Sequence, residues 1–135
     1  MTTTHTFHAP LNTNEVYYHA PTATVYAMSY QLEEGQRIGG VYGYQIGSEV
    51  AQLTPIPFQL PSTEIEPSLD AGIFDYAPSP TATHIALALS DGSIPIYLMA
   101  KAIPDPWKQV QRLETKEGDM VLGVDWREEK QLAAS

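Results

Sequence analysis

The sequence predicts an all-β fold, and three observations carry this prediction. Short runs of β-branched and aromatic residues alternate along the chain with the residue types that favour turns. The dipeptide Asp91-Gly92 lies between two apolar runs and is a strong hairpin signal, because glycine adopts positive φ without steric cost. Helical periodicity is almost absent, and only Lys108–Glu117 could be argued to form a short helix.

The first part of the chain divides into an arm, a strand unit and a linker. Residues 1–14 lack periodicity and are expected to form a frayed arm or an added edge strand. The unit 15–54 holds four predicted strands, which are Glu15–His19, Ala23–Tyr30, Ile38–Ile46 and Glu49–Thr54. In the following segment, 55–68, prolines at positions 55, 57, 61 and 67 oppose both a regular ladder and a helix. We therefore expect Pro55–Pro67 to be a linker between two sheet units.

Strand signals start again after this linker. The unit 69–114 contains strands and turns that read, in order, Ala71–Tyr76, the turn Ala77–Pro80, His84–Ser90, the turn Asp91-Gly92, Ser93–Met99, the turn-rich Ala102–Trp107 and a weaker strand at Gln109–Glu114. A third unit opens within residues 119–135. Its predicted strands, Met120–Trp126 and Leu132–Ser135, flank the charged turn Arg127–Lys130.

An internal repeat connects these units. The segment Gly72–Tyr76 (GIFDY) aligns with Leu122–Trp126 (LGVDW), and His84–Ser90 aligns with the strand that ends at Ser135. A looser third copy comprises Glu15–His19 and Val25–Tyr30, with Ile38–Ile46 in the place of Ser93–Met99. The repeat predicts that each unit is one copy of the same small antiparallel sheet.

A sheet of this kind cannot bury both of its faces alone, and radial stacking against neighbouring sheets solves that problem. We therefore expect a β-propeller. Known rings close with at least ~4 blades, so the chain is expected to supply about two blades plus the start of a third, as a fragment or completed by another chain. Self-association through unpaired blade faces is then possible. A small self-contained β-sandwich or barrel is the alternative architecture.

Charge and composition restrict the partners. The chain has 16 acidic and 7 basic residues, a net charge of −9, and Arg37 is the only base among residues 1–100. Such a field repels phosphate backbones and anionic lipids, so neither nucleic acid nor membrane is an expected partner. The sequence has no cysteine, no apolar run of membrane-spanning length and no secretory signal at its start. A cytoplasmic location is expected.

Two segments carry a resemblance to a known family. "ATHIALALSDGSIPIYL" (82–98) followed by "VLGVDW" (121–126) resembles WD-repeat propellers. "EVYYHAPTATVYAMSYQLEEGQRIGGVYGYQI" (15–46) and "AGIFDYAPSP" (71–80) resemble the amino-terminal part of the diphthine methylesterase family. The resemblance implies a carboxylic (methyl) ester hydrolase that acts on the modified histidine of translation elongation factor 2 during diphthamide synthesis. It gives no catalytic residue for this chain, and with about half a ring the chain is expected to be inactive by itself.

Ester hydrolysis needs an activated nucleophile or water and a base, and histidines are the candidate bases. His5 and His8 are expected in a solvated arm rather than at a metal. His19 is expected to cap a turn or lie at the surface, and His84 to bond a neighbouring blade. No GxSxG, phosphate-binding loop, HExxH or EF-hand pattern occurs, and neither a cofactor nor a metal is predicted.

The remaining candidates have structural interpretations. Asp75 and Asp125 occupy equivalent repeat positions, which favours acceptance of backbone N–H groups over contact with a substrate, and Asp91 is explained by its turn. Tyr76 and Trp126 are expected in the core between blades. About half of the tyrosines at 17, 18, 26, 30, 42 and 44 must pack inward because side chains alternate along strands. The alternative function is a non-catalytic WD-repeat propeller that serves as a protein-interaction scaffold.

Overall fold

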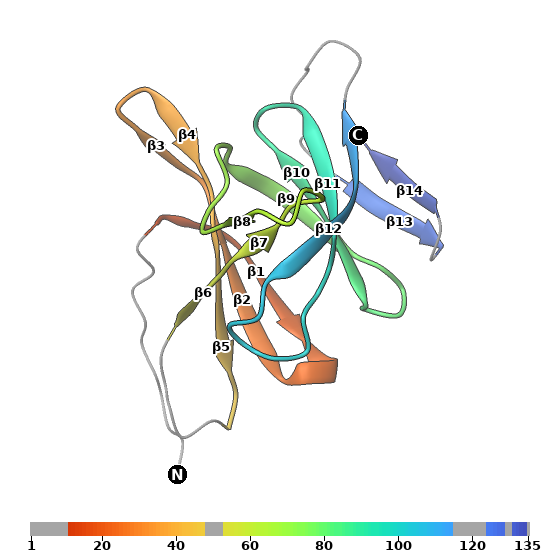
Figure 1. Ribbon diagram of the computed structural model, residues 1–135. Helices are drawn as coiled ribbons and strands as arrows, with labels where there is room; N and C mark the ends of the chain where they lie inside the picture. Colours follow the sequence, from red (N-terminus) through yellow and green to blue (C-terminus); the bar gives the residue numbers. More distant parts are fainter. Residues whose placement is uncertain (1–10, 48–52, 115–123, 129–130, 135) are drawn as a thin grey trace.

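The computed structural model of the protein describes residues 11–47, 53–114, 124–128 and 131–134, the last two ranges by their backbone only (Figure 1). Within these residues the fold is all-β, as predicted, and its one helical element is the single 3₁₀ turn η1 (Ala20–Thr22). The segment that could have formed a short helix is instead part of strand β12 (Trp107–Glu114). Alternation of buried and exposed residues at the start of β12 suits a strand that covers a core with one face.

The first sheet is a four-stranded antiparallel meander. Its order is β1 (Thr13–His19), β2 (Thr24–Ser29), β5 (Val41–Gln45) and β6 (Thr54–Ile56). Between β2 and β5 the chain forms a hairpin of β3 (Gln31–Glu33) and β4 (Gln36–Ile38), which projects from the sheet (Figure 1). Strand β1 begins inside the predicted arm. Of the predicted strand Glu49–Thr54, residues 49–52 lie outside the described part of the chain.

The second sheet repeats this meander. Strands β9 (Ile73–Pro78), β10 (His84–Leu89), β11 (Ser93–Leu98) and β12 are antiparallel neighbours. Two short strands, β7 (Phe58–Gln59) and β8 (Ile65–Glu66), extend it beyond β12. A separate hairpin of β13 (Val124–Glu128) and β14 (Gln131–Ala134) follows. No sheet closes into a barrel within the residues that the structure describes.

The proline-rich segment forms strand pairs that the sequence did not predict. Pro55 lies in β6, which pairs with β5 and is the edge strand of the described first sheet, a position where proline is tolerated because one side of the strand has no ladder to complete. The carbonyl of Pro57 accepts a hydrogen bond from Trp107 N at 2.9 Å, which starts the parallel pairing of β7 with β12. The expected linker Pro55–Pro67 is therefore corrected to three short strands. Similarly, Ala77 and Pro78 end β9, and the turn follows them at 80–83 rather than at Ala77–Pro80.

One aromatic core joins the two sheets. Tyr26 of the first sheet contacts Trp107 of the second with ring centroids 5.0 Å apart, and Phe58 packs on Tyr97 at 5.1 Å. All four side chains are at most 2% exposed. A second apolar cluster, built on Ala77, Ala86, Ala88, Ile94 and Ile96, is also buried, so the second sheet buries side chains from both faces.

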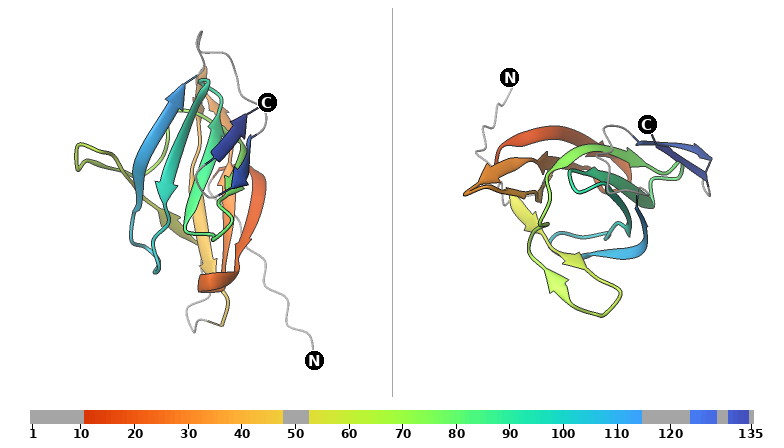
Figure 2. Two further views of the ribbon diagram at one scale, coloured as in Figure 1. Left: turned by 90° about the vertical axis from the view of Figure 1, so that its right-hand side faces the viewer. Right: turned by 90° about the horizontal axis from the view of Figure 1, so that it is seen from above.

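The three hairpins pair in the same register, which confirms the repeat seen in the sequence. The aromatic residue of each first strand faces an equivalent position of the second, as the pairs Tyr17–Tyr26, Tyr76–Leu87 and Trp126–Leu132 show. The preceding residue faces an alanine each time, in the pairs Val16–Ala27, Asp75–Ala88 and Asp125–Ala133. Strand β9 contacts β1 on one side and β13 on the other. The first strands of all three copies therefore follow one another along one side of the molecule (Figure 2).

Candidate functional site

Side-chain hydrogen bonds hold the first strands of the two large sheets side by side. The Tyr76 hydroxyl on β9 donates to the carbonyl oxygen of Val16 on β1 at 3.0 Å. Asn14 Nδ2 donates to the carbonyl oxygens of Ile73 at 2.9 Å and Phe74 at 3.3 Å. The rings of Tyr17 and Tyr76 also lie close together, with centroids 5.1 Å apart. We call the exposed surface along β1 and β9 the inner-strand surface.

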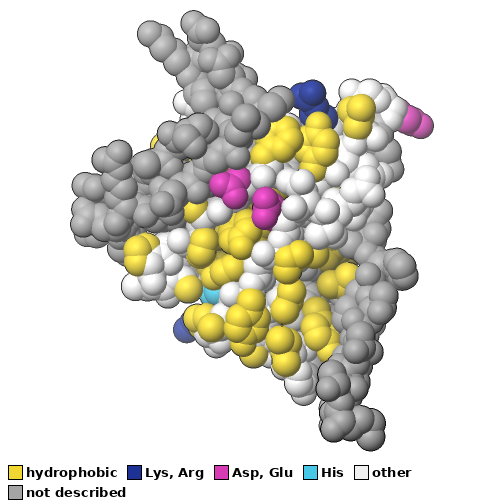
Figure 3. Space-filling view, turned by 180° about the vertical axis from the view of Figure 1, so that it is seen from behind, with side chains coloured by type: hydrophobic (Ala, Val, Ile, Leu, Met, Phe, Trp, Pro, Cys, Tyr) yellow, Lys and Arg dark blue, Asp and Glu magenta, His cyan; other side chains and the backbone are white. Residues whose placement is uncertain are grey.

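The inner-strand surface combines apolar, phenolic and acidic groups. Val16 is 57% and Tyr18 is 52% exposed, whereas Tyr17 and His19, which alternate with them along β1, point inward. Glu15 and Asp75 are both partly exposed. Hydrophobic side chains cover much of the corresponding face, with acidic groups among them (Figure 3). This surface is the candidate binding face of the chain.

The Tyr76 phenol, which hydrogen-bonds from β9 to β1, remains protonated at neutral pH. Burial raises the pKa of Tyr76, and the negative charges of Glu15 and Asp75 raise it further. Burial likewise raises the pKa of Tyr17, with smaller contributions from Tyr76 and Tyr26. A phenol whose pKa lies above its usual value of 10.0 acts as a hydrogen-bond donor rather than as a nucleophile.

His19 is a structural residue that joins the two sheets. It is 4% exposed, so the expectation of a surface position is wrong. Its Nε2–H donates to the carbonyl oxygen of Ala82 in the second sheet at 2.7 Å, so in the neutral ring Nδ1 accepts from Thr22 Oγ1, also at 2.7 Å. The bond to Thr22 agrees with the turn-capping role that the sequence predicted. Both ring nitrogens are occupied by the fold, which leaves neither free to act as a base.

Within the described residues, the His84 ring makes no bond between sheets of the kind that the sequence predicted. Its Nδ1 lies 2.9 Å from the hydroxyl of the adjacent Thr83, within the same sheet. His19 makes the cross-sheet bond instead. The sequence interpretation expected a histidine to bond a neighbouring sheet but assigned that bond to His84. Nothing in the pattern revealed that the end of β1, with His19, would lie against the 80–83 turn.

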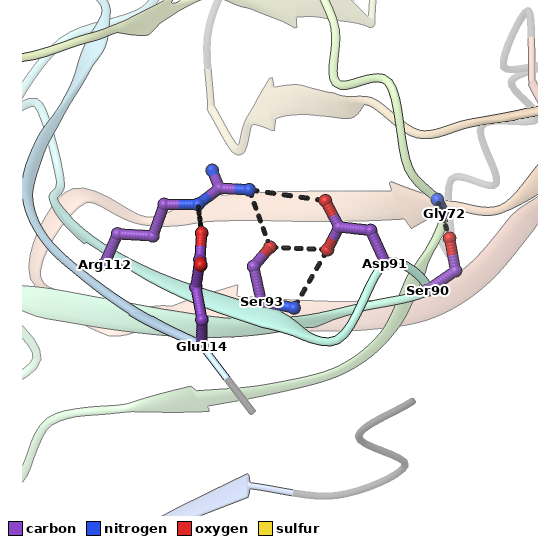
Figure 4. A network of polar contacts seen from close by, with 6 residues as sticks. All are labelled: Gly72, Ser90, Asp91, Ser93, Arg112 and Glu114. Carbon is purple, nitrogen blue, oxygen red and sulfur yellow. Dashed lines mark hydrogen bonds and ion pairs between the residues drawn. The ribbon is translucent and has the colours of Figure 1, made fainter. Parts of the chain in front are cut away.

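Asp91 belongs to a turn network, as predicted (Figure 4). Its Oδ1 accepts hydrogen bonds from Ser93 N at 2.9 Å and Ser93 Oγ at 2.5 Å, and Gly92 has a φ of 85°. Arg112 on β12 adds ion pairs to Asp91 and Glu114, both at 3.3 Å. The Arg112 and Asp91 side chains are 36% and 43% exposed, so solvent screens this pair and it stabilises the fold little.

The tyrosines divide as strand alternation requires. Tyr26 and Tyr42 are buried, Tyr18 is exposed, and Tyr17, Tyr30 and Tyr44 are half-buried. Tyr30 stacks on Phe74 of the second sheet at 5.0 Å. Tyr76, expected in the core, lies at its margin and bonds β1 through its hydroxyl. His5 and His8 lie outside the described residues, as do the side chains of Asp125 and Trp126.

Sequence reasoning missed Asn14 and the cross-strand role of the Tyr76 hydroxyl. Asn14 was assigned to the arm, and its bulge beside Glu15 has no signature in the sequence. Among the described side chains, no three His, Asp or Glu groups are close enough to hold a metal ion. No described helix has the length and apolar character needed to cross a bilayer.

The chain was compared with known proteins. No protein-family model matches it, and no curated protein is significantly similar to it.

Proposed function

We propose that the chain forms successive blades of a WD-repeat-like β-propeller of the diphthine methylesterase type. Its function in that case is the removal of a methyl ester from the modified histidine of translation elongation factor 2 during diphthamide synthesis. The observation that carries the proposal is the common register of three successive hairpins, whose first strands lie next to one another. Repetition of one sheet about an axis is the organisation of a propeller.

Burial in the second sheet supports the same arrangement. Every residue of β10 except His84 is buried. A strand with one exposed face would instead alternate between buried and exposed residues. One face of this sheet packs on the first sheet through Tyr26 and Trp107, and β13 lies against β9 and β10. A sheet covered on both faces by its neighbours is what radial stacking produces.

The glycine-rich segment that resembles the esterase family has a specific structural task. In "RIGGVYGY" (37–44), Gly39 lies so close to another backbone segment that a Cβ would be 2.4 Å from the carbonyl oxygen of Ala71. Gly39 and Leu69 exchange backbone hydrogen bonds of 3.0 and 2.8 Å across this contact. The family-like residues thus hold the connection between the two sheets, which supports a shared architecture.

The chemistry of the described residues argues that this chain does not hydrolyse the ester unaided. Both described histidines hydrogen-bond to groups of the fold, and burial raises the pKa of Tyr76, so that this phenol is protonated at neutral pH. We expect the purified 135-residue chain to release no methanol from the methyl-esterified factor. Turnover by the purified chain would contradict this part of the proposal.

The decisive experiment is deletion of the gene that encodes this chain, followed by mass spectrometry of elongation factor 2. The proposal predicts accumulation of the methyl-esterified histidine intermediate, heavier by one CH₂ unit than its hydrolysed counterpart, and recovery when the gene is restored. A normal, fully modified histidine in the deletion strain would refute the esterase assignment.

A protein-interaction scaffold is the second candidate, and the exposed Val16 and Tyr18 favour it. Large apolar side chains exposed next to each other on one strand are typical of surfaces that bind other proteins. A scaffold predicts normal elongation factor 2 in the deletion strain. It also predicts a bound protein that is lost after V16D, which changes an exposed side chain and leaves the Val16 carbonyl in place.

A further inference from the structure

A cleft between the two sheets lies at the end of the molecule where the β1–β2 turn meets the 80–83 turn. Its volume is about 600 Å³. One wall consists of residues from η1 and its flanks, together with Gln45, and the other of the 81–83 turn and the segment 98–101, which begins at the last residue of β11. The cleft is separate from the inner-strand surface and has no part in the proposed esterase function.

The electrostatic character of this cleft is opposite to that of the chain. None of its thirteen lining residues is acidic, although the chain has 16 acidic residues and a net charge of −9. Lys101 is exposed and is the one Lys or Arg in the lining. Lys108 pairs with Leu98 across β11 and β12, and cross-strand partners project from the same face, so a second exposed lysine lies beside the rim. A carboxylate is the group that fits here.

The rim of the cleft is apolar and extends beyond the cavity. Leu98 lines it and is 41% exposed. Ile46, which is 51% exposed, donates its backbone N–H to the carbonyl oxygen of the lining residue Ala23 at 2.8 Å. A small molecule within the cavity would contact Leu98 but leave Ile46 in water, whereas a polypeptide that crosses the rim would cover both side chains.

The cleft is also held open by the fold. His19 spans its base, with Nε2 bonded to Ala82 on one wall and Nδ1 to Thr22 on the other. Ala23 and Ala82, on opposite walls, both adopt left-handed backbone conformations, with φ of 49° and 57°. Alanine in this region costs on the order of 1 kcal/mol, and such strain collects at functional sites. A preformed cleft loses little conformational entropy when a ligand enters.

We propose that this cleft binds an extended segment of a partner protein in which an aliphatic side chain lies next to an acidic residue. The aliphatic side chain enters the cavity between the sheets, and the carboxylate pairs with Lys101. Flanking residues of the segment cover Leu98 and Ile46.

The test is selection of random displayed heptapeptides on the full chain, on Lys101→Glu and on a matched control, Arg37→Glu. Arg37 is an exposed base on β4, outside the lining of the cleft. The proposal predicts peptides with Asp or Glu beside Leu, Ile or Val. Charge reversal at Lys101 should weaken their binding by about tenfold or more, and reversal at Arg37 by less than about twofold. Amide NMR shifts on adding a selected peptide should concentrate at residues 19–23, 45–46, 81–83 and 98–101.

Several results would overturn the proposal. These are the absence of enriched peptides, enriched peptides without a carboxylate, equal loss of binding in both variants, and shifts concentrated away from the cleft. Hexanoate serves as a probe for a small-molecule ligand, and its binding at the cleft without any enriched peptide would also reject a protein partner. None of these results bears on the modification of elongation factor 2, so the two proposals fail independently.

Discussion

The hydroxyl of Tyr76 on β9 donates a hydrogen bond to the carbonyl oxygen of Val16 on β1 at 3.0 Å. This bond crosses from the second sheet to the first strand of the first sheet. Tyr76 occupies the repeat position that Tyr17 holds on β1, and the rings of these two tyrosines are 5.1 Å apart. The contact between the sheets is therefore made by equivalent residues of successive repeats.

Replacing Tyr76 by phenylalanine removes this hydrogen bond and leaves the ring in place. We expect Y76F to lower the free energy of unfolding by about 0.5–1.5 kcal/mol, the usual net contribution of one hydrogen bond. Urea unfolding followed by tryptophan fluorescence measures the change.

Tyr97→Phe is the matched control for this substitution. Tyr97 is fully buried, and its Oη has no hydrogen-bond partner among the residues that the structure describes. Removal of an unsatisfied buried hydroxyl is neutral or stabilising, so Y97F should leave the unfolding midpoint unchanged or raise it. Equal losses in Y76F and Y97F would show that the hydroxyl bond between β9 and β1 contributes nothing specific.

Alkaline pH should destabilise the protein through its buried phenols. Burial raises the pKa of Tyr97, Tyr26 and Tyr42, and it is also the largest cause of the raised pKa of Tyr17 and Tyr76. The unfolded chain then releases phenolic protons at a lower pH than the folded chain. The stabilisation is complete below the ordinary pKa of 10.0 and is lost as the pH rises above it. Urea unfolding at pH 8 and pH 11 measures this loss, which should be smaller in Y97F. A free energy of unfolding that does not fall above pH 10 would contradict the assigned direction.

Gly39 and Gly40 are neighbours in sequence but differ in the space around them. A Cβ on Gly39 would lie 2.4 Å from the carbonyl oxygen of Ala71 and 2.9 Å from that of Ser29, so backbone would have to move. We expect G39A to lower the free energy of unfolding by about 1–3 kcal/mol through overpacking.

Gly40→Ala provides the control for this prediction. A Cβ on Gly40 meets its nearest atoms at 3.5 Å, which is ordinary van der Waals contact. The unfolding midpoint of G40A should therefore stay close to that of the unchanged protein. The close approach at Gly39 would be refuted if both alanine variants unfolded at the same urea concentration.

Local signals in the sequence were enough to predict most strands. The Asp91-Gly92 turn and the alternating runs around it fix β10 and β11, because a tight hairpin needs only its own residues. Pairing between distant segments was not predictable in this way. β7 pairs with β12, which is nearly fifty residues away in the sequence. The prolines beside β7 argue against a strand there, because the sequence does not show which N–H groups face a ladder. Only the tertiary arrangement determines this.

The site was less accessible to sequence analysis than the fold. Repeat alignment correctly placed Asp75 and Asp125 at matching positions of two hairpins. It could not show that Asn14 reaches the Ile73 carbonyl, because that contact depends on how two sheets pack. The same limit explains why the roles of the two histidines were exchanged. The partner of His19 is set by how the two sheets pack, whereas the partner of His84 is the adjacent residue.

The last prediction concerns the stability contributed by these two histidines. His19→Ala should lower the free energy of unfolding by about 2–3 kcal/mol, because it empties a buried position and leaves the Ala82 carbonyl and the Thr22 hydroxyl without their partner. His84→Ala should cost less than about 1 kcal/mol, since His84 is half-buried and bonds only the adjacent Thr83 in the described structure. Urea unfolding of both variants, with His19→Gln as a substitution that retains one donor and one acceptor, measures the difference. If His84→Ala proved as damaging as His19→Ala, the assignment of the cross-sheet bond to His19 would be wrong, and the base of the cleft would have to be held by other contacts.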